Sequence, residues 1–280
     1  MYQLLDFGAG RKLEQFGPWR LDRPCPGTER ATPTQPELWS TADARFCGDS
    51  ATAGRWESRG EMPRRWTVRH GPVVLELKRG ESGHVGIFPE QLANWDWLTQ
   101  RLQSQGERPR VLNLFAYTGG STLACAAAGA EVVHVDAARN VVAWARRNAE
   151  LAGLAEAPIR WIHEDALKFT RREARRANRY DAVILDPPSY GHGPRGEVWR
   201  LSRDLPRLLT LCAELTAGQC RFLLLTCHTP GYDPPRLETM VREAFGEASH
   251  GGFSSEIMTL RTATGRPLPS GAVVRWTRWP

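Results

Sequence analysis

The chain has 280 residues and a mass of 31.4 kDa, which suffices for one large domain or for one domain and a smaller module. Hydrophobic residues make up 41% and charged residues 24%, with 26 Gly and 20 Pro, and this balance excludes disordered, collagen-like and disulfide-scaffold proteins. The net charge is +6, and of 37 basic residues only Lys12, Lys78 and Lys168 are lysine, so an arginine-borne positive charge permits a polyanionic partner without requiring one.

No apolar run reaches the length of a membrane-spanning helix, and residues 1–10 lack the basic and then apolar order of a signal peptide. The six cysteines form no Cys-x-x-Cys pair and have no paired histidines nearby, so we expect reduced thiols and no metal site. We therefore expect a cytoplasmic protein with no membrane partner. The pattern indicates no particular oligomeric state.

Residues 1–85 are expected to form a small β-rich module. The runs 17–23 and 66–79 have an extended character, and apolar residues alternate with polar ones after the Gly71-Pro72 turn, which predicts a hairpin over 66–78. Residues 24–64 are rich in Pro, Gly, Thr and charge, with one brief helix predicted over 37–46.

From Pro89 the apolar period changes to that of a helix, and strands then alternate with helices. The predicted strands are 110–115, 131–135, 159–163, 182–185 and 222–226, the predicted helices after the first are 121–128, 140–152, 167–177 and 201–215, and a closing hairpin is predicted from 256–261 and 271–276. Alternating βα units predict an α/β fold: a Rossmann-like domain over 86–280 with a mostly parallel, doubly wound sheet that binds ligands at the carboxyl ends of its strands.

The turn after the first strand of this domain contains Gly119 and Gly120. Two glycines let a ligand approach the backbone, and the helix start behind them offers N–H groups to an anion such as a carboxylate. The turn lacks the Gly-x-Gly-x-x-Gly spacing that cradles a pyrophosphate. An ordinary βα turn is the alternative interpretation for the glycines alone.

Acidic residues follow three further strands. Asp136, 17 residues after Gly119, lies where an acidic side chain accepts hydrogen bonds from ribose hydroxyls, and Glu164-Asp165-Ala166 lies within reach of an adenine edge. The pattern favours a nucleoside ligand with a charged amino-acid end over a dinucleotide.

Asp186-Pro187-Pro188-Ser189-Tyr190 follows the fourth strand. Two prolines hold a rigid extended turn that exposes the Asp186 carboxylate and the Pro187 carbonyl. Tyr190 can stack on a planar base.

Five stretches carry a resemblance to a known family: Phe88–Gln91, Asn113–Gly120, Val135-Asp136, Glu164–Ala166 and Asp186–Tyr190. They resemble the class I S-adenosylmethionine-dependent methyltransferases, and more narrowly the group that methylates 23S ribosomal RNA, which includes cytosine-C5 enzymes and their stand-alone relatives. The resemblance implies S-adenosylmethionine as cofactor and RNA, most specifically ribosomal RNA, as partner.

The resemblance also implies roles for single residues. It assigns the methionine end of the cofactor to five residues of the turn, namely Asn113, Phe115, Tyr117, Gly119 and Gly120. It assigns the ribose to Asp136 and the adenine to Asp165 and Ala166. It places Asp186 against both cofactor and target, with Pro187, Pro188 and Tyr190 on the substrate side.

Cys227, in Thr226-Cys227-His228, stands where the cytosine-C5 members of the group carry a nucleophilic cysteine. If the target is cytosine C5, Cys227 adds to C6, because C5 becomes nucleophilic only after that addition. If the target is a ring or exocyclic nitrogen, Asp186 and the Pro187 carbonyl orient it and Cys227 takes no part. A buried, inert cysteine is the alternative interpretation.

Two other functions stay open. The chain could methylate a small molecule or a protein, or bind S-adenosylmethionine without catalysis. Arginines at helical spacing, at 171, 172, 175, 176 and 179, and a second set at 195, 200, 203 and 207, fit either a solvated surface or an RNA contact.

Overall fold

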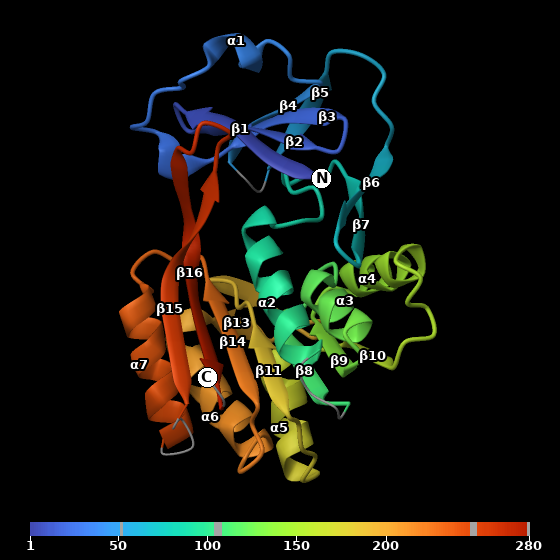
Figure 1. The fold of residues 1–280 in the computed structure, drawn as a ribbon, viewed down its shortest axis with the longest axis vertical. Coiled ribbons are helices and arrows are strands. Elements are labelled where there is room, and N and C mark those ends of the chain that lie inside the picture. Colours follow the sequence, from blue (N-terminus) through green and yellow to red (C-terminus); the bar gives the residue numbers. More distant parts are fainter. Residues whose placement is uncertain (51–52, 104–107, 247–250, 279–280) are drawn as a thin grey trace. The chain divides into compact units, whose positions relative to one another are not determined.

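The computed structural model describes residues 1–50, 53–103, 108–246 and 251–278 (Figure 1). The chain divides into two compact units, Met1–Glu90 with Thr259–Pro269 and Gln91–Met258 with Ser270–Pro280. The sequence-based boundary lay between residues 85 and 86. The first unit also includes Thr259–Pro269, a segment formed by the end of β15 (Gly252–Arg261), the start of β16 (Pro267–Thr277) and the residues between them.

The first unit contains a five-stranded sheet in the order β1-β2-β3-β4-β5 and a separate hairpin of β6 and β7. The strands are β1 (Tyr2–Gly8), β2 (Arg11–Phe16), β3 (Trp19–Pro24), β4 (Ala44–Ser50), β5 (Ala53–Ser58), β6 (Arg65–His70) and β7 (Val73–Lys78), with short helical turns η1 (Pro26–Thr28) and α1 (Pro36–Trp39). A further turn, η2 (Pro89–Gln91), crosses the division, and its last residue, Gln91, belongs to the second unit. The antiparallel pairing of β6 with β7 confirms the predicted hairpin.

The helix predicted over 37–46 is wrong in its second half. It ends at Trp39 in α1, and β4 begins at Ala44. Ala44 and Phe46 are buried whereas Arg45 between them is exposed, so this segment follows the period of two of a strand.

A buried ion pair holds the first sheet together. Glu14 in β2 is fully buried, and it contacts Arg23 in β3 at 2.6 Å and Lys12 at 3.1 Å. Burial alone would raise the pKa of Glu14, but Arg23 and Lys12 lower it below its ordinary value. The carboxylate therefore stays charged inside the unit because both cations face it.

The second unit is built on a seven-stranded sheet in the order β10-β9-β8-β11-β14-β16-β15 (Figure 1). Its strands are β8 (Arg110–Leu114), β9 (Glu131–Asp136), β10 (Ile159–His163), β11 (Ala182–Leu185), β14 (Phe222–Cys227), β15 (Gly252–Arg261) and β16 (Pro267–Thr277). The first five pair in parallel, and β16 runs antiparallel to β14. The predicted strands and the mostly parallel sheet are confirmed.

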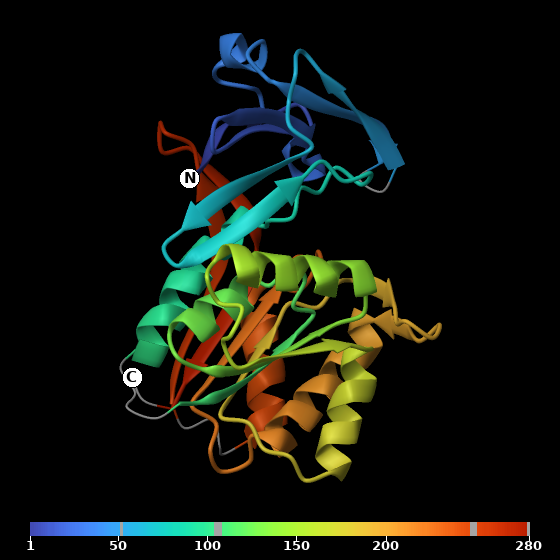
Figure 2. The same cartoon turned by 90° about the vertical axis from the view of Figure 1, so that its right-hand side faces the viewer.

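Helices cover both faces of this sheet (Figures 1 and 2). They are α2 (Leu92–Gln103), α3 (Gly120–Ala127) and α4 (Arg139–Leu151) on one face, and α5 (Ala166–Arg175), α6 (Leu201–Leu215) and α7 (Pro234–Phe245) on the other. Leu98 and Leu102 of α2 pack with Val111 and Leu224 of the sheet, while Leu208 of α6 and Leu237 of α7 belong to the core on the opposite face. The two hydrophobic cores follow from burial of both faces of a parallel sheet.

Two features of the second unit were not predicted. A hairpin of β12 (Tyr190–His192) and β13 (Val198–Arg200) lies between the predicted strand 182–185 and the predicted helix 201–215, and α7 begins at Pro234, after Asp233. None of the described helices combines the length and apolar character that crossing a membrane requires.

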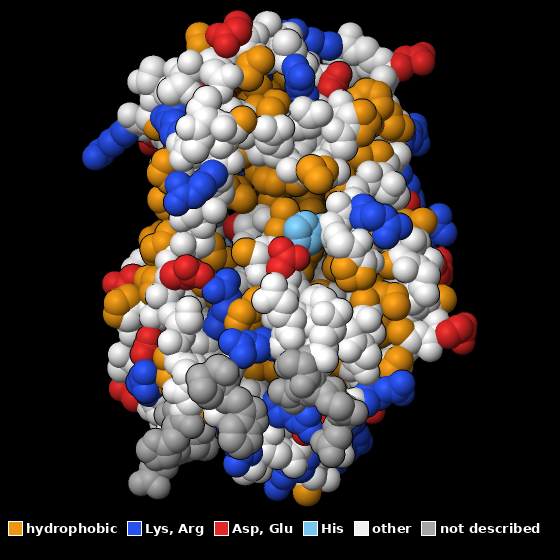
Figure 3. Space-filling model, in the orientation of Figure 1, with side chains coloured by type: hydrophobic (Ala, Val, Ile, Leu, Met, Phe, Trp, Pro, Cys, Tyr) orange, Lys and Arg blue, Asp and Glu red, His pale blue; other side chains and the backbone are white. Residues whose placement is uncertain are grey.

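On the face shown in Figure 3, Lys and Arg side chains are dispersed, with Asp and Glu side chains among them.

Candidate active site

In the turn after β8, two residues other than glycine have a positive φ, which such residues rarely adopt. Phe115 has φ +56°, Tyr117 has φ +48° and Gly119 has φ +90°. A non-glycine residue in the left-handed region carries an energetic cost of about 1–3 kcal/mol and persists only where its surroundings hold it. Here the N–H of Tyr117 donates to Oδ2 of Asp136 at 2.9 Å, which ties the turn to the end of β9.

Gly119 and Gly120 lack side chains for different reasons. Gly119 caps α3 with a positive φ, and a Cβ there would lie 3.2 Å from the Cβ of Ala145. A Cβ on Gly120 would lie 2.1 Å from Cζ2 of the buried Trp95, so the contact between α2 and α3 requires a glycine at this position. Helix packing is thus a sufficient reason for Gly120.

Asn113 lies beneath the turn. Its side chain is 2% exposed and donates to Oγ1 of Thr122 at 2.9 Å, and that hydroxyl is 2.9 Å from Nδ1 of His134. Burial lowers the pKa of His134 to about 3, so this imidazole is neutral at physiological pH. The three side chains hold the start of α3 against β8 and β9.

Asp136 ends β9 and is half-buried at the same edge of the sheet. Its Oδ1 accepts the N–H of Ala138 at 2.9 Å, and its Oδ2 accepts the N–H of Tyr117. Burial raises the pKa of Asp136, and these backbone bonds oppose that rise. Since each carboxylate oxygen has two acceptor sites, both oxygens can still accept from a pair of vicinal hydroxyls.

Asp165 follows β10 and caps the first turn of α5. Its Oδ1 accepts the N–H of Lys168 at 2.9 Å, and Ala166 beside it is buried. Burial raises the pKa of Asp165, and the nearby carboxylates of Glu197 and Asp204 add to the rise. Raised carboxyl pKa values at both Asp136 and Asp165 are typical of a functional edge.

Asp186 follows β11, with its side chain 30% exposed. Its Oδ1 accepts from Oγ1 of Thr226 at 2.6 Å, and its Oδ2 accepts from Nε2 of Gln91 at 3.2 Å. Nε2 of His228 lies 3.6 Å from Oδ1. The carboxylate is therefore held on two sides by donors from η2 and β14.

A chain of hydrogen bonds holds the side chain of Gln91 in place. Oε1 of Gln91 accepts from Nδ2 of Asn94 at 2.7 Å, and Oδ1 of Asn94 accepts from the Arg275 guanidinium at 2.6 Å. Sequence reasoning gave no role to Gln91, Thr226 or His228. Gln91 lay within the Phe88–Gln91 stretch of the resemblance, but no spacing linked it to a residue 95 positions further on.

Tyr190 begins β12, and its side chain is 53% exposed. Its ring stands at 89° to that of His192, with centroids 5.1 Å apart. The hairpin is tied to the sheet edge by Trp199, which donates from Nε1 to the Pro188 carbonyl at 2.7 Å and packs on Phe115 at 4.8 Å. Pro187 is buried and Pro188 is exposed, so the Asp-Pro-Pro turn leads from the fixed carboxylate of Asp186 into the hairpin that begins with the exposed Tyr190.

Cys227 lies on the other face of β14 from Thr226, because side chains alternate along a strand. It is 1% exposed and belongs to the same hydrophobic core as Leu223 and Leu225. Burial raises the pKa of the Cys227 thiol, and hydrogen bonds with Thr229 oppose that rise without cancelling it. The thiolate that nucleophilic addition needs is disfavoured here.

The predicted residues thus meet at one edge. Phe115–Gly120, Asp136, Asp165 and Asp186 follow four neighbouring parallel strands directly, so the topology brings them together. The edge offers three features that suit S-adenosylmethionine. The Asp136 carboxylate can accept from two hydroxyls, Asp165 lies one strand away as the N-cap of α5, and the start of α3 lies behind the left-handed turn after β8. No described group of three or more His, Cys, Asp or Glu is placed to hold a metal ion.

Comparison with curated proteins finds ribosomal RNA methyltransferases. The chain is 35% identical over 165 residues to ribosomal RNA large subunit methyltransferase I of Aeromonas hydrophila, covering 56% of this chain and 40% of the relative. It is 30% identical over 157 residues to ribosomal RNA large subunit methyltransferase K/L of Chromohalobacter salexigens, covering 55% of this chain and 20% of the relative. The chain spans less than half the length of these curated relatives.

Solved structures match over more of the chain. A SAM-dependent methyltransferase from Agrobacterium tumefaciens is 38% identical with a TM-score of 0.94, over 99% of this chain and 90% of that one. The structure of SMU.776 complexed with SAH shares the fold at 17% identity and a TM-score of 0.75, over 96% of this chain and 71% of that one. A family model described as S-adenosylmethionine-dependent methyltransferase matches residues 38–249. The chain therefore belongs to the S-adenosylmethionine-dependent methyltransferase family, and S-adenosylmethionine is its cofactor.

Proposed function

We propose that this chain transfers the methyl group of S-adenosylmethionine to a base of RNA, and that the accepting atom is a nitrogen. The proposal is supported by the carboxylate of Asp186, which is fixed by Gln91 and Thr226, and by the exposed aromatic ring of Tyr190 four residues further along the chain. A planar base stacks on the ring while its edge reaches the carboxylate.

For the cofactor, we propose that the turn from Phe115 to Gly119 and the start of α3 hold the charged methionine end. Asp136 accepts from the ribose hydroxyls, and Asp165 and Ala166 border the adenine. Asn113 and Gly120 contribute by building the turn and its packing rather than by touching the ligand, in keeping with their contacts to Thr122 and Trp95.

For the target, Asp186 and the Pro187 carbonyl accept hydrogen bonds from a base nitrogen and hold its lone pair towards the cofactor. S-adenosylmethionine, when bound, supplies an electrophilic methyl group on a sulfonium. Gln91 and Thr226 keep the Asp186 carboxylate from rotating, since each donates to a different oxygen. This arrangement orients a nitrogen without any covalent activation of the base.

The nitrogen target is preferred to cytosine C5 because of Cys227. C5 methylation requires a thiolate to add to C6. The thiol of Cys227 is 1% exposed and packed in a hydrophobic core, and burial raises its pKa, so its surroundings favour the neutral thiol over the thiolate. Under this proposal Cys227 stabilises the core and takes no part in transfer.

The choice of RNA as substrate is supported by the names of the curated relatives, both of which act on large-subunit ribosomal RNA. Because the chain spans only part of those relatives, RNA remains our proposal for this chain.

A transfer assay with matched variants tests the proposal. The purified chain is incubated with methyl-labelled S-adenosylmethionine and, in separate reactions, with the RNA, protein and metabolite fractions of cells lacking its gene, and label in each fraction is counted for the native chain, Asp186→Asn and Asp181→Asn. Asp181 precedes β11 at the opposite end of the same strand and accepts the N–H of Arg110 at 2.7 Å, so it controls for loss of a carboxylate from that strand.

We expect Asp186→Asn to lower transfer by about 100-fold or more, the scale of a positioned catalytic group, and Asp181→Asn to retain it. Label in protein or metabolite fractions instead of RNA would replace RNA with a rival acceptor. Cofactor binding without label in any fraction would support a non-catalytic binding protein.

A further inference from the structure

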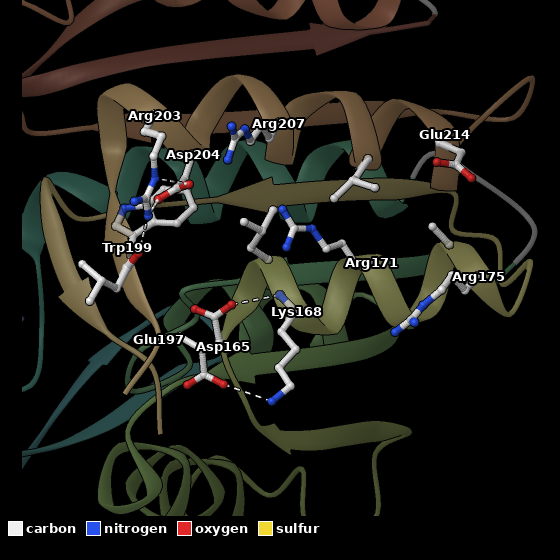
Figure 4. Close-up of a pocket in the computed structure, with 14 residues that line it drawn as sticks. Asp165, Lys168, Arg171, Arg175, Glu197, Trp199, Arg203, Asp204, Arg207 and Glu214 are labelled. Atoms are coloured by element: carbon white, nitrogen blue, oxygen red, sulfur yellow. Dashed lines mark hydrogen bonds and ion pairs between the residues drawn. The ribbon is translucent and has the colours of Figure 1, made fainter. Parts of the chain in front are cut away.

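An elongated groove of about 800 Å³ lies between α5 and α6, with β13 at one end (Figure 4). Charged side chains line it, from both helices, from the N-cap of α5 and from the residue before β13: Asp165, Lys168, Arg171, Arg175, Glu197, Arg203, Asp204, Arg207 and Glu214. The lining extends from Trp199 to Glu214, almost the whole of the 15-residue α6, which is about 22 Å at 1.5 Å per residue.

The arginines of α5 and its C-cap divide into two kinds. Arg172 contacts Glu164 at 2.5 Å, and Arg176 lies 4.0 Å from Glu173. Arg171 and Arg175 line the groove, and neither forms a hydrogen bond or ion pair with any residue that the structure describes. On this helix, therefore, the arginines outside the groove lining are paired with carboxylates, and the two that line the groove have no such partner among the described residues.

The remaining cations that line the groove are two paired ones and, among the described residues, one unpaired one. Lys168 contacts Glu197 at 3.0 Å, and Arg203 contacts Asp204 at 2.7 Å. Arg207, one turn further along α6, forms no hydrogen bond or ion pair within the described parts of the chain, although its charge adds to that of Arg203 in lowering the pKa of Asp204.

Three guanidinium groups thus share the groove without a bound carboxylate. Figure 4 shows Arg171 rising from α5 towards α6, which carries Arg207, so two positive charges come from facing helices. Like charges that face each other repel, and an anion between them reverses the sign of the interaction. The planar fork of a guanidinium fits the oxygens of a phosphate in two-pronged fashion.

One end of the groove adjoins the Asp-Pro-Pro turn through Trp199. Glu197 and Trp199 line its end, and Trp199 donates to the Pro188 carbonyl of the Asp-Pro-Pro turn at 2.7 Å. A strand whose base stacks on Tyr190 can therefore extend past β13 into the space between the helices.

We propose that this groove binds the phosphate backbone of the RNA substrate beside the target base, through Arg171, Arg175 and Arg207. This inference rests on the proposed function and adds to it the surface that holds the substrate. Phosphate contacts of this kind position a nucleic acid without reading its sequence.

A triple variant, Arg171→Gln with Arg175→Gln and Arg207→Gln, tests the proposal. Its matched control removes the same charge from exposed arginines outside the groove, as Arg108→Gln with Arg146→Gln and Arg160→Gln. Binding of a fluorescein-labelled oligouridylate is measured across salt concentrations, and kcat and KM for methylation are measured on RNA from cells lacking the gene. Affinity for S-adenosylmethionine is measured separately.

We expect the groove variant to raise KM for RNA by on the order of 10-fold or more, with kcat and cofactor affinity unchanged. The slope of log affinity against log salt should become shallower by about 2, since each phosphate contact to a single strand contributes about 0.7. The control variant should retain KM and slope. A role in folding alone would not separate KM from kcat.

The outcomes distinguish this proposal from the proposed function. If the native chain methylates RNA and both triple variants behave alike, the groove proposal is overturned and the function stands. If the native chain neither binds nor methylates RNA, both are overturned. If polyglutamate binds the native chain as tightly as oligouridylate at equal salt, an acidic protein replaces RNA as the occupant.

Discussion

Replacing Gly120 with alanine tests whether the second glycine of the turn serves helix packing or ligand approach. The added methyl carbon would lie 2.1 Å from Cζ2, 2.6 Å from Cε2 and 2.8 Å from Cη2 of Trp95, whose side chain is only 5% exposed. Such distances do not occur between real atoms, and the rigid indole cannot yield by rotating one bond. Overpacking of a core costs about 1–3 kcal/mol and sometimes more, and three sub-contact distances put this variant at the upper end.

Urea unfolding of four chains measures the effect: native, Gly120→Ala, Trp95→Leu and the double variant. Leucine at 95 removes the ring that the methyl group strikes, so we expect Gly120→Ala to be less destabilising in that background by at least about 1 kcal/mol. Affinity for S-adenosylmethionine is measured on the same chains. Loss of cofactor affinity with native stability, and with no dependence on residue 95, would refute the packing account and restore ligand approach as the reason for this glycine.

Three further predictions concern a helix cap, a buried charge and a thiol. Asp165→Ala should lose about 1 kcal/mol of stability with its cap on α5, whereas Asp165→Asn should keep the cap and the stability, as urea midpoints will show; equal loss in both would contradict the capping role. Glu14→Gln should cost about 3–5 kcal/mol by leaving Arg23 buried without a counter-charge. Because the folded pKa of Glu14 is lowered, its contribution is present above the ordinary glutamate pKa and is lost as pH falls through the folded value, so the native chain should lose more stability in acid than the variant does; parallel pH profiles would be inconsistent with this. Cys227 should resist iodoacetamide in the folded chain and react only on unfolding, as peptide mass mapping will show, and rapid alkylation in the folded state would mean that its thiol is accessible.

The elements of the second unit could be predicted because each βα step is local. The predicted strands 159–163 and 182–185 match β10 and β11 residue for residue, and the predicted helix 201–215 matches α6. Parallel pairing then brings Asp136 and Asp186 to one edge without any knowledge of side-chain contacts.

Other elements lacked a local pattern. Residues 4–8 of β1 are buried without interruption, so the alternation that marks a half-exposed strand is missing. The start of α7 carries Pro234 and Pro235, which are typical of a turn, although both precede the part of a helix that needs backbone donors. Asp233 caps that helix by accepting the N–H of Arg236 at 3.0 Å.

The contacts that shape the site were beyond prediction for a physical reason: they join residues that are distant in the chain. Gln91 meets Asp186 across 95 positions, and the indole of Trp95 sets the requirement at Gly120. The burial of Cys227 depends on the helices packed over its face of β14. Its position in the sequence alone therefore fitted a nucleophile as well as it fitted a buried, inert cysteine.

The identity of the methylated atom distinguishes transfer to a nitrogen beside Asp186 from transfer to cytosine C5 through Cys227. RNA from cells lacking the gene is incubated with the purified chain and S-adenosylmethionine, digested to nucleosides and analysed by mass spectrometry, with Asp186→Asn and Cys227→Ala alongside. We predict one nucleoside methylated on nitrogen, lost in Asp186→Asn and undiminished in Cys227→Ala. Methylation at cytosine C5 that disappears in Cys227→Ala would contradict the account.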